Sequence, residues 1–100
     1  MSHQKIRLAH IYIEQADISR QQSDLPGAIA SFTKAIELYK ELAAEEPACW
    51  NLVADTIERA AATYKAAGDL DNAKSTLEEA AALREKLSLL ESRQSSEDDD

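Results

Sequence analysis

The chain has 100 residues, which is one domain's worth, and it carries 19 acidic against 11 basic residues for a formal net charge of −8. It has no basic stripe, which argues against partners such as nucleic acid or an anionic membrane surface. Cys49 is the only cysteine, so no intrachain disulfide can form, and the first residues have no apolar core of signal-peptide length. We therefore expect a cytoplasmic protein.

The composition favours helix, because alanine, leucine and glutamate are the most abundant residues and all lose little entropy in a helix. The β-branched residues form no alternating run that would predict a strand. Apolar residues at helical spacing predict four helices, at about 3–22, 25–45, 48–67 and 70–90. The links between them are only two or three residues long, so consecutive helices are expected to be antiparallel.

The predicted helix boundaries each have a physical cause. Asp24 and Asp69 are placed to cap the second and fourth helices, and Pro26 suits the first turn of the second helix. Pro47 ends that helix, since a proline disfavours helical angles in the residue before it. Gly68 follows the third helix as a left-handed stop.

The chain also repeats itself. When it is shifted by 45 residues, the matching positions are mostly apolar, which indicates a repeat of core geometry. The matched pairs include Ala9 with Ala54, Ala16 with Ala61, Ala28 with Ala73, Phe32 with Leu77 and Ala35 with Ala80. We therefore expect one helical domain over 1–91, with repeats at about 3–46 and 47–91, and an acidic, disordered tail over 92–100.

These residues resemble the tetratricopeptide repeat. That motif has a small residue and an aromatic on its first helix, a glycine near the turn, and an alanine–large apolar–alanine series on its second helix. The second unit supplies Ala61, Tyr64, Gly68, Ala73, Leu77 and Ala80, and the first supplies Ala16, Ala28, Phe32 and Ala35. The first unit departs from the motif at Ser19, in place of the aromatic, and at Ser23, in place of the glycine.

The period of 45 exceeds the standard period of about 34 residues by about three helical turns, which lengthens a helix without rotating its apolar face. The pattern is therefore similar to the extended repeats of kinesin light chains. The resemblance implies an all-α fold of two tandem antiparallel hairpins in a right-handed stack. A closed four-helix bundle, which long hairpins can also form, remains open as an alternative.

The resemblance further implies that the inner face of the stack, formed by the first and third helices, binds a peptide or helix of another protein. The residues expected on this face are His10, Ile13, Asp17, Arg20 and Gln21 from the first helix and Asp55, Glu58, Ala62 and Lys65 from the third. Chaperone-binding relatives use basic and asparagine side chains there to clamp a terminal carboxylate. Ile13, Asp17 and Glu58 occupy three of those places, so an acidic chaperone tail is not the expected ligand.

We accordingly expect a protein-interaction module, an adaptor or chaperone-like binder, with no enzyme activity and no cofactor. His3 and His10 lie on one helix face, but no third ligand stands at helical spacing, so no metal site is predicted. Two alternatives stay open. One is a self-associating structural protein, using Leu83, Leu87 and Leu90 as a homo-oligomer contact. The other is an acidic inhibitor or immunity-type protein that covers a basic surface.

Overall fold

The computed structural model describes the backbone of residues 2–98 and the side chains of residues 3–91. It contains the four predicted helices: α1 (Ser2–Gln21), α2 (Leu25–Glu45), α3 (Trp50–Ala66) and α4 (Leu70–Asp98). A short 3-10 helix, η1 (Pro47–Cys49), precedes α3 where the sequence predicted the start of the α-helix itself. The described part of the chain contains no strand, so the fold is all-α.

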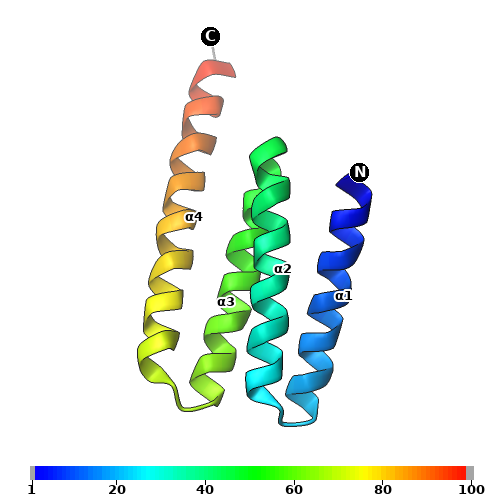
Figure 1. The fold of residues 1–100 in the computed structure, drawn as a ribbon. Coiled ribbons are helices and arrows are strands. Elements are labelled where there is room, and N and C mark those ends of the chain that lie inside the picture. The colour runs from blue at the N-terminus through cyan, green and yellow to red at the C-terminus, as the bar shows by residue number, and fades with distance from the viewer. Residues whose placement is uncertain (1, 99–100) are drawn as a thin grey trace.

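The helices form an open stack and not a closed bundle. Each helix contacts the next along the chain, α1 against α2, α2 against α3, and α3 against α4. Figure 1 shows α1 and α4 at opposite edges of the molecule, whereas a closed four-helix bundle would pack them together. The described residues form a slab of 53 × 33 × 16 Å, whose smallest dimension fits two layers of helices.

The fourth helix is longer than predicted. The sequence placed its end at about Leu90, where the last apolar residue stands, but the helical backbone continues to Asp98. The predicted boundary is therefore wrong. A helix makes its backbone hydrogen bonds within itself, so it can continue beyond its last apolar residue. Residues 99 and 100 lie outside the described residues, and the separate acidic tail stays a prediction. No helix of the described chain is long and apolar enough to cross a membrane.

Alanines form the contacts at which the helices approach most closely. The eight alanines paired by the 45-residue shift are all buried, and none is more than 5% exposed. The positions are Ala9, Ala16, Ala28, Ala35, Ala54, Ala61, Ala73 and Ala80. Larger side chains fill the space between these contacts, notably Phe32, Tyr39 and Leu42 of α2. The repeat seen in the sequence is therefore a repeat of packing.

The turns of the two hairpins repeat as well. Asp24 accepts a hydrogen bond from the amide of Gly27 (3.1 Å), and Asp69 accepts one from the amide of Asn72 (3.2 Å). Before these caps, Ser23 has φ 63° and Gly68 has φ 82°. Both are left-handed, so the first hairpin keeps the turn of the motif although it lacks the glycine that adopts this conformation without cost.

We predict that Ala61→Leu lowers the free energy of unfolding by about 1–3 kcal/mol, because Ala61 is buried at a close helix contact that cannot accept a larger side chain. Ala62→Leu is the matched control, since Ala62 is exposed and the change should stay within about 0.5 kcal/mol. Urea unfolding of the two variants measures the difference. Equal stabilities would show that the close packing described here is wrong.

Candidate functional site

The face expected to bind a partner is built by α1 and α3. Both helices pack on α2, where Ala16 of α1 and Ala60 of α3 belong to one apolar cluster with Phe32. The expected binding residues share exposure to solvent: His10, Arg20, Gln21, Asp55, Ala62 and Lys65 are exposed, and Ile13, Asp17 and Glu58 are half-buried. We call these nine residues the inner face.

Asp17 connects the two halves of the inner face. Its carboxylate lies 3.9 Å from a guanidinium nitrogen of Arg20 on α1 and 4.0 Å from one of Arg59 on α3. The second contact crosses between the hairpins, so it holds the inner edges of α1 and α3 together. All three side chains are about half exposed, and exposed pairs of this kind contribute only about 0.2–1 kcal/mol each. Their effect is on side-chain position more than on stability.

Two acidic residues of the inner face are already engaged by Arg84 of α4. Its Nε and Nη2 atoms each donate to the Glu58 carboxylate at 2.8 Å, and Nη2 also donates to Asp55 at 2.6 Å. The hydrogen bond from Arg84 holds the pKa of the Glu58 carboxyl below its ordinary value, and the two carboxylates raise the pKa of the guanidinium. We call these three residues the Arg84 clamp.

Arg84 is not among the residues predicted from the sequence, although a signal for it is present there. The 45-residue shift places Arg84 on Tyr39, Asp55 on His10 and Glu58 on Ile13. In the first hairpin the rings of His10 and Tyr39 pack edge to face, 6.3 Å apart and at 67°. Tyr39 is buried, and burial raises the pKa of its hydroxyl. The second hairpin therefore replaces aromatic packing with a charged clamp at the same place in the repeat.

Charge is distributed unevenly along the inner face. Arg20 and Lys65 lie in the last turns of α1 and α3, with Arg59 nearby, and Asp17 is the carboxylate that pairs with Arg20 and Arg59. The carboxylates of Asp55 and Glu58 lie nearer the start of α3, where the Arg84 clamp holds them. The inner face thus has a cationic end next to the hairpin turns. Within the described residues, no three His, Cys, Asp or Glu side chains converge on a possible metal position.

The leucines expected at a homo-oligomer contact lie in different environments. Leu83 packs against the buried cluster that contains Tyr39 and Val53, so it is part of the core. Leu87 is half-buried, and Leu90 is exposed beside Leu89. Of the three leucines, Leu90 therefore has the side chain that is most accessible to a partner.

Comparison with known protein families finds a match in the second hairpin. The family model described as the tetratricopeptide repeat matches residues 54–87, which run from early α3 through most of α4. This segment contains Asp55, Glu58 and Arg84, the whole of the Arg84 clamp. Searches of curated proteins and of solved structures found no match to this chain.

We predict that Glu58→Gln lowers the melting temperature at pH 7 and that this difference shrinks as the pH falls below about 4.5, the ordinary pKa of the group. A lowered pKa means that the folded state favours the carboxylate, so the stabilisation is present above the ordinary pKa and is lost as the pH falls through the lowered one. Thermal melts over pH 3–7 measure it. Glu37→Gln is the control, because Glu37 is exposed and forms no ion pair among the described residues. A pH-independent difference for Glu58→Gln would contradict the clamp.

Proposed function

We propose that this chain is an adaptor that binds a peptide or helix on its inner face. Residues 54–87 match the tetratricopeptide repeat, a module that generally binds other proteins or peptides and is generally not an enzyme. The observation that supports the proposal is the contact between Asp17 of α1 and Arg59 of α3, at 4.0 Å, which brings together the two helices that carry the nine mixed apolar and polar residues expected on this face. Such a surface offers both contact area and polar selectivity.

The charges on the inner face indicate which charged and apolar groups the ligand carries. The cationic end, with Arg20, Arg59 and Lys65, suits an acidic side chain or a terminal carboxylate near the hairpin turns. At the other end, Arg84 already neutralises part of the charge of Asp55 and Glu58, so this end offers a ligand less uncompensated charge. Ile13 and Ala62 lie between and suit an apolar side chain.

The same residues argue against a ligand held by a full carboxylate clamp. A terminal carboxylate held in the middle of the face would lie next to Asp17 and Glu58, and like charges at such distances repel. The proposed ligand is therefore an internal segment or helix whose acidic residue reaches the cationic end, with apolar residues along the rest.

We predict that Ala62→Arg abolishes capture of the partner while leaving the fold intact. Ala62 is exposed in the middle of the inner face, so a long cationic side chain there blocks the approach of a ligand without disturbing the core. The measurement is site-specific photocrosslinking in native lysate, with the photoreactive residue at Gln21 on the inner face. Ala44→Arg is the matched control, because Ala44 is equally an exposed helical alanine but lies on α2.

The proposed face is supported if a crosslinked protein appears with the parent chain and with Ala44→Arg but not with Ala62→Arg. Retention of the same crosslinked protein by Ala62→Arg would show that binding takes place elsewhere.

A further inference from the structure

Three large apolar side chains are exposed on one stripe of α1, away from the inner face. Leu8 is 41%, Ile11 47% and Ile18 52% exposed. The 45-residue shift places them on Val53, Thr56 and Thr63 of α3, which are all buried, at 3% exposure or less. In α3 this stripe also contains Ala60, which packs against Phe32 of α2. The outer stripe of α1 therefore matches the surface by which α3 packs on α2.

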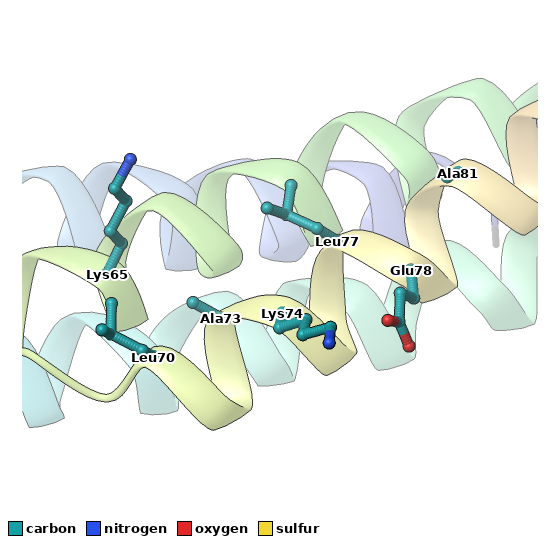
Figure 2. Close-up of a pocket in the computed structure, with 7 residues that line it drawn as sticks. All are labelled: Lys65, Leu70, Ala73, Lys74, Leu77, Glu78 and Ala81. Carbon is teal, nitrogen blue, oxygen red and sulfur yellow. The ribbon is translucent and has the colours of Figure 1, made fainter.

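A complementary surface lies on the outer side of α4. An open groove of about 440 Å³ runs beside the first turns of this helix, and Leu70 and Leu77 in it are 64% and 50% exposed (Figure 2). The groove is lined by Lys65, Leu70, Ala73, Lys74, Leu77, Glu78 and Ala81. In the first hairpin, the position of Leu77 is held by Phe32, which is fully buried against α3. We call this surface the α4 groove.

The α1 stripe and the α4 groove correspond to the two halves of the α2–α3 interface, each without its counterpart. We propose that a second copy of this chain docks its α1 stripe into the α4 groove, so that copies join head to tail and repeat the packing of α3 on α2. The junction shares only Lys65 with the inner face, at the edge of the α4 groove, and the proposal does not depend on the proposed function.

Charge complementarity favours a second copy as the occupant. Within one chain, Lys40 of α2 lies 3.5 Å from Glu79 of α4, an ion pair between successive hairpins. The 45-residue shift places Glu85 on Lys40 and Lys34 on Glu79. Across the junction of two copies, Glu85 of one would face Lys34 of the next, so the pair is kept with its signs exchanged. Both side chains are exposed in the single chain.

Polar residues at matching positions of the two surfaces also favour a second copy as the occupant. The residue of α1 that corresponds to Ala60 is Gln15, which is polar and exposed. The groove residues that correspond to Ile29 and Thr33 of α2 are Lys74 and Glu78. An amide entering the α4 groove can accept a hydrogen bond from the lysine and donate one to the glutamate, so the polar residue meets polar partners.

A junction of this kind is heterologous, because two different surfaces meet. Each copy that is added leaves one free α1 stripe and one free α4 groove, so growth gives an open helical filament unless the rotation per copy closes a ring. The inner faces of successive copies then line up as one longer surface, α1 and α3 of each copy in turn.

The experiment separates the two surfaces and then recombines them. Ile11→Glu blocks the α1 stripe, Leu77→Glu blocks the α4 groove, and Leu89→Glu is the control at another exposed leucine, outside the junction. Helix content by circular dichroism checks that each variant is folded. Sedimentation equilibrium over a wide concentration range is expected to show concentration-dependent oligomers for the parent chain and Leu89→Glu, and monomers for Ile11→Glu and for Leu77→Glu.

Mixing the two blocked variants is the decisive step. Each keeps one intact surface, so the mixture is expected to form a 1:1 dimer with twice the monomer mass and nothing larger. A parent chain that stays monomeric at the highest concentration would overturn the proposal. So would a mixture that stays monomeric, or dissociation by Leu89→Glu alone, since both point to contacts other than the junction.

The charge pair gives an independent readout. Lys34→Glu or Glu85→Lys alone is expected to raise the dissociation constant of the junction about 2- to 5-fold, as expected for one exposed ion pair, and the double variant is expected to restore it. A double variant that is as weak as the sum of the single changes would show that Lys34 and Glu85 do not meet.

Discussion

Close approach of helices at alanine is the constraint on which the rest of this structure depends. Two helices can pack at short distance only where neither presents a large side chain, and the buried alanines meet this condition at matching positions in both hairpins. That contact fixes the height and rotation of each helix. The inner face exists because α1 and α3 are held in the same register on their partners, and the α4 groove exists because α4 is held in the register of α2.

The two hairpins share geometry but differ in chemistry. Tyr39 and Arg84 occupy equivalent places, yet one is a buried ring beside His10 and the other a cation between two carboxylates. Aromatic packing in the first hairpin is indifferent to ionic strength, whereas the Arg84 clamp weakens as salt screens it. At this place in the repeat, the second hairpin therefore responds to ionic strength and the first does not, and the Arg84 clamp lies within the segment that matches the tetratricopeptide repeat.

The sequence predicted features that have local causes. Asp24, Asp69, Pro47 and Gly68 act on neighbouring residues, so the turns could be placed from the chain alone. The Arg84 clamp joins residues 26 and 29 positions apart, and its geometry depends on how far α4 is rotated against α3, which no single helix determines. The choice between open stack and closed bundle was undecidable from the sequence, because the apolar stripes of α1 and α4 suit either.

Ser23 gives the first hairpin a weakness that the second does not share. A left-handed serine costs about 1–2 kcal/mol that Gly68 does not incur, and this strain is stored in the turn between α1 and α2. Opening of that turn releases it, so α1 has the lower free energy of local unfolding. We therefore expect the amide hydrogens of α1 to exchange with solvent sooner than those of α3, through local opening at the α1 edge. The inner face can therefore widen on one side while α3 and α4 stay in place.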